Sequence, residues 1–308
     1  ERMIRWKYFS ISLRSVSALI FSFIVLTGLV GNPHTSIAAS FTWLIWWTLL
    51  IFFIAFGGKI YCAACPWDFF ADLFQFGLSK SVHGEKKSLQ KKWPKFMRNF
   101  YPATILFIII TWLELGFHLT SDSYLTSILG VMVVGAVVLS SQIFERRSFC
   151  RFACPIGRIS GVYAQTSPIE MRVRKKEVCQ TCSGMECVRG GDNGTKCPTF
   201  QLPYKLNQNT YCTLCTECVR ACPEQNLTLY ARPLNEDLKK VRQTRMDEGL
   251  LVIVVIILTF FHGLTMTPTW LNWTNAVGQV LNVDYLFSFT LLMITLMVGT
   301  FLLLSATD

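Results

Sequence analysis

The sequence predicts an all-α membrane protein with six transmembrane helices and an inserted, cysteine-rich α+β domain. Three observations predict it: long apolar stretches, basic residues confined to three segments, and cysteines in closely spaced groups. Apolar residues make up 52 % of the 308 residues and charged residues only 16 %, whereas a soluble globular chain carries roughly 25 % charge. This shortage of charge excludes a disordered protein and argues against a purely soluble one.

Six stretches are long and apolar enough to cross a hydrocarbon core of ~30 Å, which takes about 20 helical residues. We expect spans at Val16–Val30, Phe41–Phe56, Phe100–Phe117, Tyr124–Phe144, Gly249–Met266 and Tyr285–Leu304. The second is short, but Trp43, Trp46 and Trp47 can anchor its outer end. The first is not expected to be a cleaved signal peptide, because its apolar run is too long and no small-residue cleavage site follows.

The basic residues predict the orientation. All 29 Lys and Arg lie before the first span or at its edge, between the second and third spans, or between the fourth and fifth. The positive-inside rule then places both termini and the two long basic segments in the cytoplasm, with the chain as a multi-pass protein of the cytoplasmic (inner) membrane. Because topology accounts for the net charge of +10, we expect membrane lipid and no nucleic acid as a partner.

The spans divide the chain into three expected domains. Residues 1–166 form a four-helix membrane domain, residues 167–248 a cytoplasmic cysteine-rich domain, and residues 249–308 two further transmembrane helices. Between the spans, Pro66–Leu78 is expected to be an amphipathic helix on the inner membrane surface. Thr267–Asp284 is expected to be an outer loop whose tryptophans lie at the interface.

The strongest motif is Cys212-x2-Cys215-x2-Cys218-x3-Cys222-Pro223, the bacterial ferredoxin run for a [4Fe–4S] cluster. Three thiolates spaced in this way reach three irons of one cube, and the fourth binds the other cluster in two-cluster ferredoxins. A preceding group, Cys179-x2-Cys182-x4-Cys187-x9-Cys197-Pro198, follows the same logic with wider spacing. The crossed pattern predicts two clusters: cluster 1 on Cys179, Cys182, Cys187 and Cys222, and cluster 2 on Cys212, Cys215, Cys218 and Cys197.

Two other interpretations of these eight cysteines are weaker. Disulfides fit poorly in a reducing cytoplasm. A zinc site would not need the Cys-Pro dipeptide that ends both groups. The domain is therefore expected to be bacterial-ferredoxin-like, with two [4Fe–4S] clusters.

Four further cysteines follow the second and fourth spans in similar motifs, at Lys59–Pro66 and Arg147–Pro155. Each motif runs from a basic residue through an aromatic residue to Cys, two or three further residues, and Cys-Pro, which indicates an internal duplication of a two-span unit. Two such units side by side would gather the thiols of Cys62, Cys65, Cys150 and Cys154. Four thiolates suit a third iron–sulfur cluster, and the open alternatives are a transient copper or zinc site, a redox dithiol pair or structural packing.

These motifs resemble the membrane polyferredoxin family, which includes electron-transfer subunits of periplasmic nitrate reductase, the nitrous-oxide reductase maturation protein and a copper-reducing oxidase accessory protein. The resemblance covers roughly residues 1–245. The chain departs from the family in two places: its first motif has two residues between the cysteines where the family often has three, and two spans follow the ferredoxin segment. No flavin-binding domain, Gly-rich phosphate loop or nucleophile motif is visible, so a non-catalytic component of an oxidoreductase complex is expected.

Three ionisable residues near the outer ends of the expected spans are further candidates. Glu114 and His118 lie four residues apart and are expected to share a helix face, and His262 lies in the outer half of the fifth span. Ionisable groups inside a membrane are costly and therefore default to functional candidates. They suggest a quinol site, or one b haem between His118 and His262, or simply interfacial residues satisfied by water or a neighbouring helix.

The sequence thus predicts single-electron transfer at the cytoplasmic membrane. The leading hypothesis is a quinone-linked subunit of a respiratory complex, and the alternatives are a copper-reducing assembly factor and a redox-sensing regulator. The cysteines are expected at the inner face and the Glu114 group near the outer face, so ~30 Å would separate them. We therefore expect other subunits of a redox complex as stable partners.

Overall fold

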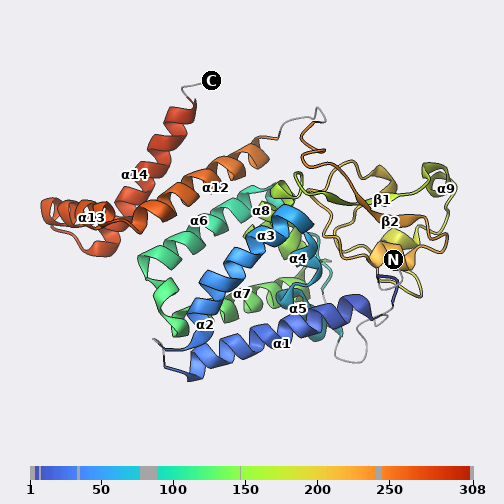
Figure 1. Ribbon diagram of the computed structural model, residues 1–308, viewed down its shortest axis with the longest axis horizontal. Coiled ribbons are helices and arrows are strands. Elements are labelled where there is room, and N and C mark those ends of the chain that lie inside the picture. The colour runs from blue at the N-terminus through green and yellow to red at the C-terminus, as the bar shows by residue number, and fades with distance from the viewer. Residues whose placement is uncertain are drawn as a thin grey trace.

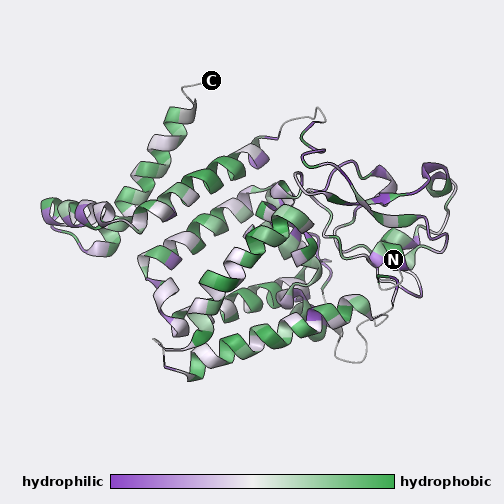
Figure 2. Ribbon diagram, viewed as in Figure 1, coloured by the Kyte–Doolittle hydropathy of each residue, from purple (hydrophilic) through white to green (hydrophobic). Residues whose placement is uncertain are grey.

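The structure is a computed structural model that describes residues 4–6, 8–32, 35–76, 89–145, 147–239 and 245–305. A body of helices carries a small domain of strands and short helices at one end, and the N-terminus lies beside that small domain (Figure 1). Apolar residues cover the helices of the body, and hydrophilic residues gather in the small domain (Figure 2). The division into a membrane part and a polar cysteine-rich part follows from this contrast.

Five long stretches of helix are apolar enough to cross a membrane, judged by length and composition in the described residues. They are α1 (Phe9–Val30), the continuous stretch of α2 (Ile37–Ala39), η1 (Ser40–Trp46) and α3 (Trp47–Gly57), α7 (Ser123–Ile143), α12 (Met246–Thr265) and α14 (Tyr285–Ser305). The sixth expected span is the apolar helix α6 (Tyr101–Gly116), whose 16 residues reach about 24 Å at 1.5 Å per residue. It is shorter than the others, so a sixth full span stays a prediction.

The helices nearest the N-terminus pack around the short helix α5 (Pro66–Phe76). Both α1 and α7 pack against α5, and α1 also packs against α7. The sequence predicts an amphipathic helix here, lying on the inner membrane surface. The helix forms and packs against both α1 and α7, with Asp68 buried; its position on the membrane surface stays a prediction, and residues 77 and 78 of the expected helix lie outside the described residues.

The connection between α12 and α14 is a helix rather than the expected loop. α13 (Pro268–Leu281) begins with Pro268 at its first turn and ends at Asn282, which adopts the left-handed conformation common at helix C-termini. Its Trp270 is only 1 % exposed and packs edge-on against Phe261 of α12 and Phe289 of α14. α13 folds back onto α12 and α14 and buries the Trp270 ring, whereas Trp273 is 43 % exposed; an interfacial position for the two tryptophans stays a prediction.

The small domain contains the α+β elements that the sequence predicted. Strands β1 (Ile169–Val173) and β2 (Leu227–Ala231) pair antiparallel, with Met171 opposite Leu229. Between them lie α9 (Lys176–Gln180), α10 (Glu186–Arg189), η5 (Pro203–Lys205) and α11 (Glu217–Ala221). Met171, Leu214, Val219 and Leu227 form its small apolar core. Most of the chain between the strands is loop, as expected of a domain built around cysteines.

Short helical elements complete the body, and one of them leads to the small domain. The body is completed by α4 (Ile60–Ala63), η2 (Lys95–Met97), η3 (Leu119–Ser121), η4 (Phe149–Ala153) and α8 (Pro155–Tyr163). Of these, α4 and η4 follow two of the long helices, and α8 leads directly to β1. The cysteine motifs of the body therefore lie at the end that carries the small domain (Figure 1).

Candidate functional site

The two Cys-Pro motifs of the body end in the same local structure. Each Pro that follows the second cysteine begins a helix, α5 after Cys65 and α8 after Cys154. The sulfur of Cys154 accepts a hydrogen bond from the backbone N–H of Gly157 at 3.3 Å, and that of Cys65 accepts one from the backbone N–H of Asp68. Each cysteine thus caps a helix N-terminus, where free N–H groups and the helix dipole favour negative charge on sulfur.

The one-residue difference between the motifs is absorbed by a π-turn. Cys150 lies in the π-helical segment η4, which ends with a hydrogen bond from the N–H of Cys154 to the carbonyl of Phe149 at 2.8 Å. Cys62 lies instead in the short α-helix α4. A π-turn takes one residue more than an α-turn. The longer second motif can therefore present its Cys-Pro end as the shorter first motif does.

The structure brings the four cysteines of these motifs together. Cys65 lies close enough to interact electrostatically with Cys62 and Cys154, and Cys150 does so with Cys65 and Cys154. Burial is the main reason that the pKa values of the Cys65 and Cys150 thiols are raised, and it raises that of Cys154 to about 11. Buried thiols are neutral without a metal, whereas a coordinating thiol is deprotonated. These four thiols are therefore suited to binding a metal ion or a metal cluster.

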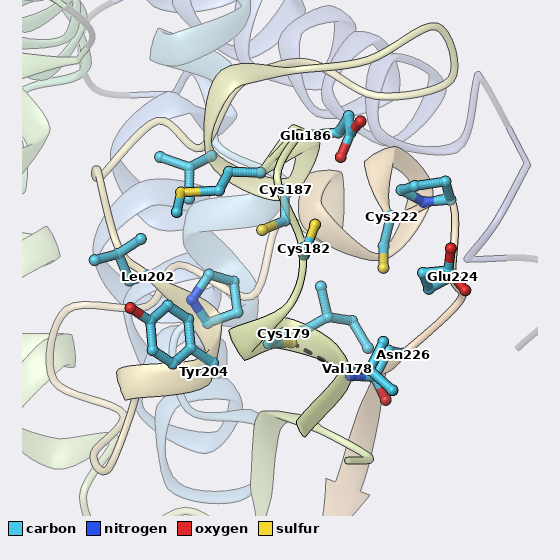
Figure 3. A pocket seen from close by; sticks show the side chains of 15 residues that line it. Val178, Cys179, Cys182, Glu186, Cys187, Leu202, Tyr204, Cys222, Glu224 and Asn226 are labelled. Atoms are coloured by element: carbon cyan, nitrogen blue, oxygen red, sulfur yellow. Dashed lines mark hydrogen bonds between the residues drawn. The ribbon is translucent and has the colours of Figure 1, made fainter. Parts of the chain in front are cut away.

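The cysteines assigned to cluster 1 line a pocket in the small domain. Cys179, Cys182, Cys187 and Cys222 surround about 490 Å³ of space, including the part that opens to solvent. The sulfurs of Cys182, Cys187 and Cys222 turn toward this space, and Asn226 donates to the sulfur of Cys179 at 3.3 Å (Figure 3). Cys222 comes from the second cysteine group of the sequence, so the chain crosses over as the ferredoxin pattern predicts.

The cysteines assigned to cluster 2 form a separate group. Cys212 interacts electrostatically with Cys215 and Cys197, and Cys218 interacts with all three. The intervening Leu214 and Thr216 adopt positive φ angles of 52° and 61°. Backbone N–H groups in such a loop turn inward and make an anion-binding concavity, and here Leu214 donates to the sulfur of Cys212. Both predicted groupings of the eight cysteines are therefore present in space, and their assignment as cluster ligands stays a prediction.

The three quartets approach one another pairwise. Lys59 interacts electrostatically with Cys62 and Cys154 of the membrane quartet and with Cys212 of cluster 2. Cys218 of cluster 2 interacts in turn with Cys187 of cluster 1. The membrane quartet thus neighbours cluster 2, and cluster 2 neighbours cluster 1.

The chemistry of the donors fits iron–sulfur cubes. All twelve cysteines are free thiols, and they fall into three groups of four. Among the described residues, no three His, Cys, Asp or Glu side chains lie as close together as one metal ion needs. A cube does not require that closeness, because each thiolate binds a different iron.

A buried charge cluster that the sequence pattern did not predict lies beside the membrane quartet. Asp68 accepts from Arg14 at 2.8 Å and pairs with Arg147 at 2.5 Å, and Asp72 pairs with the same two arginines. The cluster joins α1, α5 and the turn before Cys150. The signal was available as Arg14 inside the first apolar helix and Asp68 three residues after Cys65, each of which requires a partner in an apolar setting.

The candidate quinol or haem residues are only partly brought together. Glu114 is 7 % exposed, and its Oε1 lies 3.7 Å from Nε2 of His262. The expectation that His118 shares a helix face with Glu114 is wrong, because α6 ends at Gly116 and His118 adopts a φ of 54°. The ring of His118 lies beside Tyr285 instead, with centroids 5.7 Å apart. Glu114 and His262 form the pair that the structure supports, and a ligand for it stays a prediction.

Comparison with known proteins agrees with this geometry. A family described as a 4Fe-4S binding domain matches residues 39–83 and 126–177, and each matched segment contains one of the Cys-Pro motifs of the body. No solved structure matches the chain.

Two curated proteins are similar over part of the chain. The "Putative electron transport protein YccM" of Escherichia coli (strain K12) is 35 % identical over 89 residues, which is 28 % of this chain and 22 % of that protein. The "Methylamine utilization ferredoxin-type protein MauN" of Methylorubrum extorquens is 25 % identical over 138 residues, or 44 % of this chain and 48 % of that protein. The chain thus spans less than half the length of either relative. These findings confirm the resemblance to membrane polyferredoxins and an iron–sulfur, electron-transport character.

Proposed function

We propose that this chain, an iron–sulfur protein similar to the membrane polyferredoxins, relays single electrons along a row of three [4Fe–4S] clusters. The observation that carries the proposal is the sorting of all twelve cysteines into three quartets that neighbour one another in space. The membrane quartet would hold the third, membrane-proximal cluster. Electrons would pass between the quinone pool or a partner redox subunit and an acceptor, and the chain would be a non-catalytic component of an oxidoreductase complex.

The residues around each quartet support a role in setting the reduction potentials of the clusters rather than in making or breaking covalent bonds of a substrate. The clusters supply one-electron chemistry when they are bound. The chain holds them with thiolates, donates backbone N–H groups from Gly157, Asp68 and Leu214 to sulfur, and buries the membrane quartet. Hydrogen bonds to sulfur and burial are the means by which a protein sets a cluster potential.

The sidedness proposed here rests on charge. All the basic residues fall in the segments that the positive-inside rule assigns to the cytoplasm. The ferredoxin-like domain and both termini would then be cytoplasmic in the inner membrane. Reduced thiols, which cluster assembly needs, persist in that compartment.

A quinone site is the part of the relay that requires a partner. Glu114 and His262 could accept and pass on protons from a quinol, and a b haem is a weaker alternative for the histidines. Glu114 lies toward the end of α6, two residues before the helix stops, away from the cysteine end of the body (Figure 1). A partner subunit would carry electrons across that gap, or would bring a quinone site beside the membrane quartet.

The experiment replaces Cys62 and Cys150 with Ser and measures reduction of clusters 1 and 2 by quinol in membranes. We expect quinol to lose its ability to reduce them, because the membrane quartet is the entry or exit point. Dithionite is the matched control, since it reduces soluble clusters directly and verifies that both still assemble. Unchanged reduction by quinol would take the membrane quartet off the path and favour the alternative, a copper-reducing assembly factor for a respiratory enzyme.

A further inference from the structure

Lys59 is a buried lysine whose amino group has no carboxylate partner among the described residues. It is 5 % exposed, and no described Asp or Glu lies within ion-pair distance of it. Its Nζ donates to the backbone carbonyl of Thr210 at 3.2 Å, which uses one of three N–H donors. Lysine is almost never fully buried unless it is paired, and an unpaired buried charge is strongly destabilising. The position therefore calls for negative charge from another source.

The cysteine sulfurs of two quartets, one on each side of Lys59, can supply this negative charge. Burial and the nearby Arg158 lower the pKa of Lys59, and the sulfurs of Cys62, Cys212 and Cys154 raise it. Cys62 and Cys154 belong to the membrane quartet and Cys212 to cluster 2. A [4Fe–4S] cluster with four thiolates carries net negative charge, so a cluster in each quartet would give Lys59 the counter-charge that the acidic residues do not.

The fold makes room for this lysine between the body and the small domain. A Cβ added to Gly161 of α8 would lie 2.5 Å from the carbonyl oxygen of Thr210 and 3.2 Å from Nζ of Lys59. A glycine at this point of α8 lets the loop before Cys212 approach closely. The lysine, the loop and α8 thus meet where the two quartets face each other.

The second motif has a basic residue at the same place, but its charge is already balanced. Arg147 stands three residues before Cys150, as Lys59 stands three before Cys62. It interacts electrostatically with Cys215 and Cys150, but Asp68 and Asp72 pair with it. Lys59 alone of the two therefore presents an uncompensated charge to the quartets.

We propose that Lys59 is a positioning residue that raises the reduction potentials of the membrane-proximal cluster and cluster 2 together. The inference rests on the proposed function. An added electron makes a cluster more negative, so a nearby cation favours the reduced form, and burial leaves that interaction little screened. Cluster 1 should not share this effect, because the groups that act on Cys179 and Cys187 are Asn226, other cysteines and backbone rather than Lys59. Electrons would then rest on the two clusters that face Lys59 in preference to cluster 1.

The test is an EPR-monitored redox titration of the full-length protein with Lys59→Gln. Glutamine removes the charge but keeps an N–H donor for the Thr210 carbonyl. We expect the two clusters next to residue 59 to become harder to reduce by roughly tenfold or more in equilibrium constant, where tenfold is about 59 mV for one electron. Cluster 1 should not move. Lys59→Arg should keep the wild-type potentials, and Lys205→Met, at an exposed site, is the control for net charge.

The outcomes separate this inference from the relay itself. Wild-type iron content with unchanged potentials in Lys59→Gln would overturn the role of Lys59 and leave the three-cluster relay standing. A wild-type protein with only two clusters would overturn the relay as proposed. If Lys59→Gln fails to assemble, Lys59→Arg decides: preserved potentials support a role for the charge, and lowered potentials with full iron content overturn it.

Discussion

The motifs Lys59–Pro66 and Arg147–Pro155 are alike in geometry and different in electrostatics. Both end in a Cys-Pro pair whose cysteine caps the next helix through sulfur, and the π-turn of the second absorbs its extra residue. Lys59 of the first motif donates to a backbone carbonyl and has no carboxylate partner among the described residues, whereas Arg147 of the second pairs with two aspartates. The two motifs thus keep the same local geometry around their cysteines, while the charges beside those cysteines differ.

The helices that follow the two motifs also differ. After the first motif, α5 is inserted between α1 and α7 and carries Asp68 and Asp72 into the body. After the second, α8 leads out to the small domain and passes the Thr210 carbonyl at Gly161. One motif is therefore anchored in the membrane part and the other docks the ferredoxin-like part.

The largest expected effect comes from removing either motif alone. If each repeat supplies two ligands, Cys62→Ala with Cys65→Ala and Cys150→Ala with Cys154→Ala should each lose about four iron atoms per chain, the content of one cube. Iron assay and EPR of each purified double variant measure this. Full iron content in one of the two variants would break the equivalence of the repeats.

Arg147→Gln should destabilise the protein more than Lys59→Gln and change the potentials less. Removing one partner of a buried pair costs about 3–5 kcal/mol because Asp68 is left with Arg14 alone. The charge removed was already balanced, so the clusters lose little. Denaturant titration in detergent and EPR titration give the two quantities, and a potential shift larger than that of Lys59→Gln would contradict the asymmetry.

Gly161→Ala should weaken the docking of the small domain by roughly 1–3 kcal/mol, the usual effect of overpacking. The added methyl group would meet the Thr210 carbonyl at 2.5 Å, and backbone cannot move aside cheaply. Gly135→Ala in α7 is the control, since a Cβ there meets nothing within 4 Å. Limited proteolysis of the small domain reports the loosening, and equal protection of the two variants would count against a close contact at α8.

Asp72→Asn should have the smallest effect, within about 1 kcal/mol, because the Asp72 side chain is 28 % exposed and solvent screens its pairs with Arg14 and Arg147. Partial release of the Arg147 charge should make the membrane cluster slightly easier to reduce. A redox titration of this variant checks the direction, and a shift toward harder reduction would contradict the balancing role of the aspartates.

The cysteine groups were predictable because cluster ligands must recur at short spacings in the sequence. The grouping of Cys222 with Cys179, Cys182 and Cys187, and of Cys197 with the others, followed from the crossed ligand pattern of two-cluster ferredoxins. Lys59 was visible as the first residue of a motif, but its lack of a carboxylate depends on tertiary packing. The turn of α13 onto α12 and α14, which buries Trp270, and the end of α6 before His118 depend on packing and local backbone, which hydropathy does not report.

Iron and acid-labile sulfide per chain, with EPR of the reduced protein, test the central claim most directly. Three quartets predict about 12 iron atoms and as much sulfide, since each cube holds four. Replacement of Cys62 and Cys150 with Ser should lower the iron to about 8 and remove one EPR signal. A wild-type value near 8 that the same replacements leave unchanged would contradict the membrane-proximal cluster and leave a two-cluster ferredoxin on a membrane body.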